Sequence, residues 1–380
     1  IQIIKKDVIM EFSIDKKDLL KNLQLLSKAV PSRSTLPIIS SALFTVNNNE
    51  LNLRATDLEI SLNIKCNIIS ASDGSIAIPL SKLLEITNAM PSGNLNFNIS
   101  DIGKVNIKSA SGNYTIMGQP ADEFPKEQTI ENSSNLNMQS SDLKDIIIST
   151  SYAASKDDLK PVLQGILFQI KNNEIVTVAT DGHRLVKLEK KQLETLSFSG
   201  NVVIPIKFLI LLLTQLTEDE NIIMLIGENH IQIQINNVII TSRTINDSYP
   251  DYEGVIPKDN TKTLIINKNN FYEAIKRVSI FSNKTSKQVS LELNESNIII
   301  KTEDPENITT GKETLDCNYD GEPMTIGYNA LYLKEVLQQQ SSEEIKIMLK
   351  SPLNAGLFIP MNQEENNIKT TLLMPIRLND

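Results

Sequence analysis

One unit recurs along this chain at a nearly constant spacing, and no other feature of the sequence constrains the fold as strongly. Asn48-Asn49-Glu50-Leu51 and Ala55-Thr56-Asp57 return as Asn172-Asn173-Glu174-Ile175 and Ala179-Thr180-Asp181, each position displaced by 124 residues. A fainter third copy runs from Val289 to Glu303. This period is far longer than the repeat of a solenoid, so the sequence predicts three tandem domains.

Other landmarks recur in the same register. Ile78-Pro79 and Ile204-Pro205 each open an apolar helical run, and Ile326-Gly327-Tyr328-Asn329 opens one in the third copy. Phe124-Pro125, Tyr249-Pro250 and Met374-Pro375 are interpreted as the ends of the three copies. The predicted divisions are an N-terminal extension outside the fold over residues 1–9, and domains over 10–130, 131–258 and 259–380.

Each copy mixes helix and strand. Residues 11–14 alternate as a strand does, and the leucines of residues 16–30 form an amphipathic helical stripe that Asp15 or Asp18 is expected to cap. Short strands separated by Asn- and Gly-rich turns follow, and a second helix is predicted over residues 81–90. The fold class is therefore α+β, with two helices packed on an antiparallel sheet in each domain.

The net charge of −9 argues against a nucleic-acid binder that relies on its whole surface. Positive charge is nevertheless concentrated. Residues 16–30 and 268–284 each carry four basic side chains and one acidic side chain, whereas residues 140–160 carry three and four. Two matched basic helices favour a sequence-independent track for phosphates over ordinary solvated helix faces.

An enzyme is the second hypothesis, and Asp181, His183 and Arg184 are its best residues because Asp and His are common acid–base partners. Asp181 recurs as Asp57 without a histidine, however, which indicates a structural turn. Nucleophile-elbow, phosphate-loop and metal-ligand spacings are missing from the sequence, and the two cysteines are expected to be reduced thiols. We expect no catalytic residue, metal or cofactor, and a cytoplasmic chain without membrane segments. A triplicated protein-interaction scaffold without a DNA partner remains the other alternative.

From Met10 to Leu378 the chain resembles the bacterial β sliding clamp family, the processivity subunit of DNA polymerase III. The motifs that carry the resemblance are Met10–Ile14, Thr35–Ile38, Ala179–Leu185, Tyr249–Tyr252 and Met374–Leu378. The resemblance implies a head-to-tail homodimer whose six domains form a ring, with helices lining the hole. Such a ring encircles double-stranded DNA without sequence preference and tethers the polymerase. It is a non-catalytic accessory subunit of a DNA-directed DNA polymerase, itself a nucleotidyltransferase.

The resemblance also implies a groove for short linear peptides from polymerases, the clamp loader and repair proteins. Two departures from the family pattern affect it: Gly254 replaces a frequent arginine, and Asn379-Asp380 add negative charge after the usual terminal leucine, so acidic peptide flanks are expected to be tolerated less well. The groove residues carried over are Leu163, Thr180, Gly182, His183, Arg184, Leu185, Pro250, Val255, Asn329, Tyr332, Leu372, Met374, Pro375, Ile376, Arg377 and Leu378.

Further residues follow from the same resemblance. Arg33 matches a loop residue that contacts the duplex, and Lys82 and Lys207 occupy equivalent helix starts and are candidate DNA contacts. Aromatic DNA contacts of the second domain are replaced here by Pro161 and Val162. Tyr114, Ile280 and Phe281 match the dimer contact, although Ile280 and Phe281 also fit the core side of an amphipathic helix.

Overall fold

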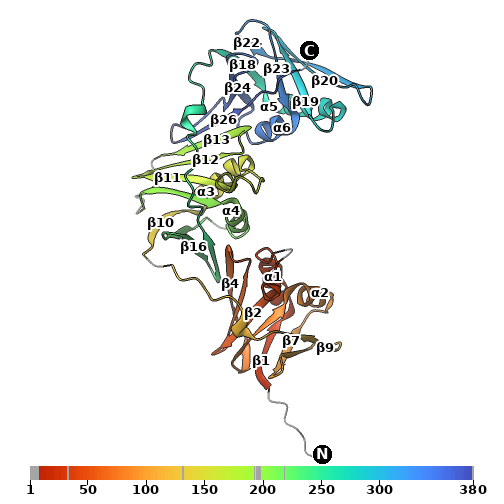
Figure 1. Cartoon of the computed structure of the whole chain (residues 1–380), viewed down its shortest axis with the longest axis vertical. Coiled ribbons are helices and arrows are strands. Elements are labelled where there is room, and N and C mark those ends of the chain that lie inside the picture. Colours follow the sequence, from red (N-terminus) through yellow and green to blue (C-terminus); the bar gives the residue numbers. More distant parts are fainter. Residues whose placement is uncertain are drawn as a thin grey trace, which may run out of the picture. The chain divides into compact units, whose positions relative to one another are not determined.

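A computed structural model describes residues 8–31, 34–130, 132–191, 193, 198–217 and 219–378. The chain divides into two compact units, of which the first comprises residues 1–137 and 211–244 and the second residues 138–210 and 245–380. The division runs through helix α4 (Ile206–Leu213) and strand β10 (Ser134–Gln139), and therefore through the second predicted domain. Figure 1 labels the elements along the chain.

The first unit contains two antiparallel sheets in the described ranges. The smaller sheet has the order β5-β1-β7-β8-β9, and the larger has the order β10-β15-β16-β17-β4-β3-β2-β6. The strands are β1 (Val8–Asp15), β2 (Ser41–Asn47), β3 (Glu50–Thr56), β4 (Ile60–Asn67), β5 (Ile69–Ser72), β6 (Gly74–Pro79), β7 (Asn94–Ser100), β8 (Lys104–Lys108), β9 (Asn113–Met117), β15 (Asn221–Ile226), β16 (His230–Ile235) and β17 (Val238–Arg243).

Two helices of this unit, α1 (Lys16–Leu26) and α2 (Leu80–Ala89), pack against each other and against strands of both sheets (Figure 1). The Asp15 side chain caps α1 by accepting a 2.8 Å hydrogen bond from the backbone N–H of Lys17, as predicted. Leu19, Leu23 and Leu26 form the buried stripe of α1.

The second unit also contains two sheets among its described residues, with the orders β14-β11-β12-β13-β26-β25-β24-β18-β22 and β21-β20-β19-β23. Its helices are α3 (Ser140–Thr150), α5 (Lys268–Val278) and α6 (Ala330–Gln338). Its strands are β11 (Gly165–Lys171), β12 (Glu174–Thr180), β13 (Arg184–Lys190), β14 (Gly200–Pro205), β18 (Lys262–Asn267), β19 (Gln288–Leu293), β20 (Asn297–Asp304), β21 (Thr309–Asp316), β22 (Asn318–Tyr319), β23 (Met324–Asn329), β24 (Glu344–Leu349), β25 (Gly356–Pro360) and β26 (Asn367–Leu373).

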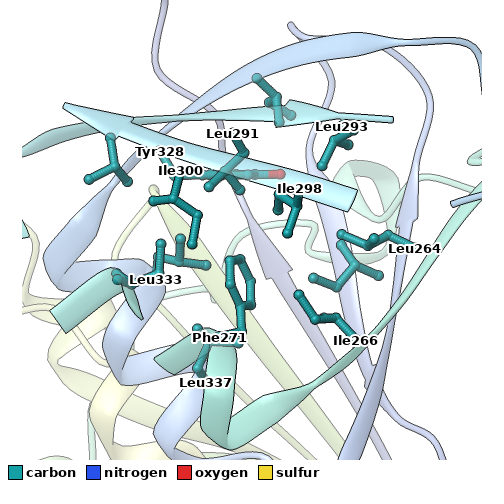
Figure 2. Close-up of a cluster of buried hydrophobic side chains, with 14 of the residues drawn as sticks. Leu264, Ile266, Phe271, Leu291, Leu293, Ile298, Ile300, Tyr328, Leu333 and Leu337 are labelled. Atoms are coloured by element: carbon teal, nitrogen blue, oxygen red, sulfur yellow. The ribbon is translucent and has the colours of Figure 1, made fainter. Parts of the chain in front are cut away.

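The core of the third repeat shows how helices and sheets meet. Phe271 of α5 points toward Leu291 and Ile298 of the small sheet, and Leu333 and Leu337 of α6 close the same cluster (Figure 2). All five side chains are buried. The two helices thus cover apolar sheet faces, as the α+β prediction requires.

The two junctions between repeats use the same strand pairing. In the first unit β4 pairs with β17, with Ile60 opposite Ser242. In the second unit β13 pairs with β26, with Arg184 opposite Leu373. Three isolated bridges mark equivalent positions just beyond these strands and β9: Ala77 with Gln119, Val203 with Ile245, and Gly327 with Ile376.

These bridges correct one landmark. Phe124-Pro125 and Tyr249-Pro250 follow their bridge residues Gln119 and Ile245, whereas Met374-Pro375 precedes Ile376. The constant proline spacing is therefore a coincidence in the third copy, and Met374-Pro375 occupies a different structural position.

Four predicted boundaries also need correction. The helix expected over residues 16–30 ends at Leu26, because Pro31 disfavours helical geometry at Val30 and the preceding turn tightens into bonds from Lys28 to Leu25. The helical runs of residues 140–160 and 268–284 end at Thr150 and Val278, each followed by a short 3-10 turn. Strand β1 begins at Val8, inside the segment assigned to an extension, while residues 1–7 lie outside the described ranges.

Candidate functional site

The turn between β12 and β13 is held by its own side chains. The Thr180 hydroxyl donates to the Arg184 carbonyl oxygen at 2.6 Å, and Asp181 Oδ1 accepts from the backbone N–H groups of His183 and Arg184 at 2.8 and 3.0 Å. Gly182 has a φ of +92°, which suits glycine. Asp181 is thus committed to the backbone and is not placed to act as an acid or base.

The first repeat builds the same turn. Thr56 donates to the Ile60 carbonyl oxygen at 2.8 Å, and Asp57 Oδ1 accepts from the N–H groups of Glu59 and Ile60 at 3.0 and 2.7 Å. Leu58 stands where Gly182 does, with a φ of +79°. The prediction that the Thr-Asp pair has a structural role is confirmed.

The C-terminal tail crosses from this turn to the third repeat. The Met374 N–H donates to the His183 carbonyl oxygen at 2.9 Å, and the Ile376 N–H donates to the Gly327 carbonyl oxygen at 2.9 Å. A Cβ at Gly327 would lie 2.7 Å from the Ile376 oxygen and 2.6 Å from Leu378 Cδ2. The glycine therefore allows the tail to lie directly on β23.

The Arg184 side chain is buried and is held by several contacts. Its side chain is only 5% exposed, its Nε lies 3.2 Å from Asp181 Oδ2, and its terminal nitrogens donate to Glu335 of α6 and to the Tyr152 carbonyl oxygen. The guanidinium carbon also lies 4.7 Å from the centre of the Tyr332 ring and 5.2 Å from that of Tyr152. A buried cation requires such compensation, so these contacts fix the guanidinium in one place.

Arg184 also lines a hollow in the protein surface. His183 is exposed and stacks on Tyr332, with ring centres 5.7 Å apart and planes at 20°. Leu331 and Glu335 supply the α6 side of the hollow, whose volume is about 420 Å³. It is lined by Ala154, Ser155, Lys156, Asp157, Lys160, Asp181, His183, Arg184, Leu331, Tyr332 and Glu335.

Three of the predicted groove residues, His183, Arg184 and Tyr332, line this hollow. The loop residues Lys156 and Lys160 and the α6 residue Glu335 were missed by the sequence prediction. The loop had a signal, because Lys160-Pro161-Val162 is offset by 124 residues from the quoted Leu36-Pro37-Ile38. Glu335 had none.

The other predicted groove residues differ in exposure and in their contacts. Leu163, Leu185 and Leu372 are buried, and the last two share a core cluster with Tyr252. Val255 and Met374 are 58% and 43% exposed, which leaves apolar surface open to a partner. The Thr180 hydroxyl donates a hydrogen bond within its own turn, and the Asn329 side chain caps α6. Gly182, Pro250 and Arg377 are exposed, and Pro375, Ile376 and Leu378 are half-buried.

Comparison with known proteins identifies this arrangement. Family models for the DNA polymerase III beta subunit match residues 10–129 (N-terminal domain), 137–251 (central domain) and 253–377 (C-terminal domain). The beta sliding clamp of Pseudomonas putida is 30% identical over 371 residues, which cover 97% of this chain and all of that protein. The chain belongs to the bacterial β sliding clamp family.

Solved clamp structures agree with the fold. The sliding clamp of Bartonella birtlesii bound to griselimycin is 27% identical, with a TM-score of 0.91 over 97% of this chain and all of that one. The Bacillus subtilis clamp is 26% identical, with a TM-score of 0.91 over 98% of this chain and all of that one. The chain is thus three tandem clamp domains, and it is a non-catalytic processivity factor of DNA replication.

The candidate DNA contacts are surface residues where the structure describes them. Arg33 lies outside the described residues, as do Asn379 and Asp380. Lys82 is exposed and pairs with Glu85 at 3.1 Å, and Lys207 is exposed in the first turn of α4. Pro161 and Val162 begin a short 3-10 turn.

The dimer-contact candidates lie on open surface. Ile280 and Phe281 are 76% and 42% exposed, so the alternative that they belong to the core is wrong. Tyr114 is half-buried on β9, an edge strand. None of the helices in the described ranges is long and apolar enough to cross a membrane.

Proposed function

We propose that this clamp is a cytoplasmic head-to-tail homodimer that closes around double-stranded DNA and holds partner peptides in the groove beside His183 and Met374. The proposed domains are residues 10–130, 131–258 and 259–380. The observation that carries the dimer is the repeated junction. The β4–β17 and β13–β26 pairs are equivalent, and their equivalents β21 and β9 stand at the outer edges of their sheets among the described strands.

The internal junctions also supply a register for the contact between chains. Thr56 faces Ser61, Thr180 faces Leu185, and Thr302 faces Gly311, so Thr310 corresponds to Ile60 and Arg184. Counting back from the bridge residue Gln119 gives Ile116 as the equivalent of Ser242 and Leu373. We therefore expect Thr310 of one chain to face Ile116 of the next, and Lys312 to face Tyr114.

Apolar surface beside both edges supports this contact. Ile280 and Phe281 lie next to β21, where the Thr309 hydroxyl donates to the Phe281 carbonyl oxygen at 3.1 Å. Met117, at the end of β9, is 56% exposed. An exposed edge strand with apolar neighbours is a template for another strand, and a heterologous contact closes into a ring when its rotation completes a circle.

DNA is the partner expected inside the ring. The lysines of α1 and of the turn after it are the strongest candidates for phosphate contacts, because Lys17 and Lys21 of the helix and Lys28 of the turn are exposed and make no ion pair in the described part of the chain. Lys82, Lys207 and Arg33 remain proposed helpers. Such contacts are independent of sequence, as a mobile tether needs.

The proposed partner groove comprises the sixteen residues carried over from the family resemblance. Its support is the exposed apolar surface at Val255 and Met374 beside the hollow, and the polar rim of His183 and Tyr332. Two related clamps were solved bound to griselimycin, and we propose that this compound binds the proposed groove of this chain.

Cysteine crosslinking tests the ring and its register together. In a background with Cys66 and Cys317 replaced by Ser, Tyr114→Cys with Lys312→Cys is expected to form an interchain disulfide on mild oxidation, because opposed residues have neighbouring Cβ atoms. Asn113→Cys with Glu313→Cys, one step along, provides the second opposed pair, since close and wide pairs alternate. Tyr114→Cys with Glu313→Cys places the thiols on opposite faces and is the matched control.

To test encirclement, the reduced clamp is first loaded onto nicked circular DNA by a clamp loader and is then oxidised, because a ring crosslinked at both interfaces could not open for loading. A closed ring should stay on circles in denaturant and leave after the circle is linearised, whereas a scaffold would be retained on neither. Equal crosslinking of the control pair, or a monomer at all concentrations, would refute the proposed dimer. For the groove, Met374→Ala with Leu378→Ala should remove griselimycin binding and polymerase stimulation while the ring still forms.

A further inference from the structure

Five side chains of the second unit form a continuous series of cation and aromatic contacts, which we call the cation–aromatic ladder: Lys369, Tyr152, Arg184, Tyr332 and His183. Lys369 Nζ lies 5.9 Å from the centre of the Tyr152 ring, and the Arg184 guanidinium lies 5.2 Å from the same ring. Arg184 is also 4.7 Å from Tyr332, which stacks on His183. The ladder runs from the interior to the rim of the hollow.

The two ends of the ladder differ in exposure. His183 is exposed, whereas Lys369 on β26 is only 7% exposed and lines a separate cavity of about 210 Å³ with Gln339, Asn367 and Asp145. Lys369 donates one 2.7 Å hydrogen bond to the Gln339 carbonyl oxygen. Burial lowers the pKa of Lys369 to about 8, although the charge of Asp145 raises it. An ammonium held this deeply needs the Tyr152 ring as part of its solvation.

Tyr152 is the one member of the ladder that contacts both buried cations. Its ring receives Lys369 and Arg184, its carbonyl oxygen accepts from Arg184, and its hydroxyl lies 3.5 Å from the Thr371 hydroxyl. It does not line the hollow. Arg184, which connects to the turn at Asp181 and to Tyr332, is therefore the side chain through which Tyr152 can act on a bound partner.

We propose that Tyr152 is a positioning residue for the partner groove, holding Arg184 so that His183 and Tyr332 keep the stacked arrangement that a bound peptide meets. The proposal rests on the groove being the partner site. It requires the ring of Tyr152 and not its hydroxyl, because both cations contact the ring face.

A purely structural role is the competing explanation. On that account Tyr152 only accommodates the buried Lys369 ammonium, and its loss would destabilise the chain without a specific effect on the groove. The two accounts separate when the ammonium is removed as well. Lys369→Met keeps the length of the side chain and its apolar stem while eliminating the buried charge.

The experiment compares Tyr152→Phe, Tyr152→Leu, Lys369→Met and the Tyr152→Leu/Lys369→Met double variant in the full chain. Griselimycin affinity is measured by titration calorimetry, and thermal stability is measured as the midpoint temperature of unfolding. Tyr152→Phe should bind within about twofold of the wild type, and Tyr152→Leu about 3- to 30-fold more weakly. The double variant should regain thermal stability but keep the weakened affinity.

Histidine NMR provides a readout that needs no ligand. The chain has two histidines, and His230 lies in the first unit, so its signal is an internal reference. Tyr152→Leu should shift the His183 ring signals and leave those of His230 in place, while Tyr152→Phe should shift neither. An unmoved His183 signal in Tyr152→Leu would overturn the proposal, and so would a double variant that regains affinity together with stability. If Met374→Ala leaves griselimycin binding intact, the partner site is misassigned, and the His183 signal still decides the positioning role.

Discussion

The most exposed residue of the proposed dimer contact allows a quantitative test. Ile280→Ala removes three carbons, worth about 2.4 kcal/mol if fully buried at roughly 0.8 kcal/mol per methylene. Ile280 is 76% exposed in the single chain. At most that fraction can be newly buried in a dimer, which leaves about 1.8 kcal/mol per interface.

A head-to-tail dimer contains this contact twice. The two sites together weaken association by up to about 3.6 kcal/mol, which is roughly a 400-fold rise in the dimer dissociation constant. The stability of the isolated chain should hardly change, because an exposed side chain contributes little to folding.

Sedimentation equilibrium over nanomolar to micromolar concentration measures this constant directly. Leu353→Ala is the matched control, since Leu353 is 65% exposed in the same unit but lies between β24 and β25, which belong to the larger sheet and not to that of β21. A dissociation constant for Ile280→Ala within about threefold of the wild type would show that the contact lies elsewhere. The same conclusion would follow if Leu353→Ala weakened the dimer equally.

Three further changes have definite expectations. Gly327→Ala forces a Cβ to 2.7 Å from a tail carbonyl oxygen, so griselimycin affinity should fall at least about tenfold while denaturant unfolding shows a loss of about 1–3 kcal/mol. Lys17→Gln with Lys21→Gln should lower the salt dependence of clamp affinity for a linear duplex by a slope of about 2, and an unchanged slope would exclude α1 from phosphate contact. Asp145→Asn should destabilise the chain at pH 7 and have no effect well below pH 4, as urea unfolding against pH would show. Burial raises the pKa of the Asp145 carboxyl, but the hydrogen bond and charge of Lys190 outweigh it and hold the pKa below its ordinary value, so this stabilisation is present above the unfolded pKa and disappears as pH falls through the folded one.

Local patterns in the sequence predicted the local parts of the fold. Asp15 as a helix cap and the Thr-Asp turn needed only neighbouring residues, and both predictions hold. The turn was predictable because Asp57 and Asp181 share their surroundings but not a histidine. Helix ends were less accurate where turns tighten before a proline, as at Pro31.

The proposed groove was harder to predict because the residues that support it come from different repeats. Arg184 and Glu335 are 151 residues apart in sequence, and no spacing rule connects them. In the sequence, Lys369 looks like any polar residue of a strand, here β26. Only tertiary packing places it against Tyr152. The strand pairing across repeats had no sequence signal for the same reason, and the proline at position 375 gave a false equivalence.

Counting charges on matched helices also overstated their similarity. The four basic residues of the α5 region include Lys276, which pairs with Glu273 at 3.3 Å, and Arg277, which makes a bidentate contact with Glu313 at 2.8 and 2.7 Å. Glu313 lies on the edge strand β21, so this arginine orients the strand that we expect the next chain to pair with. The basic side chains of α1 have no such partners in the described residues. The two equivalent helices therefore differ in their contacts, and we propose that α1 provides positive charge for phosphates while α5 supports the edge strand that closes the ring.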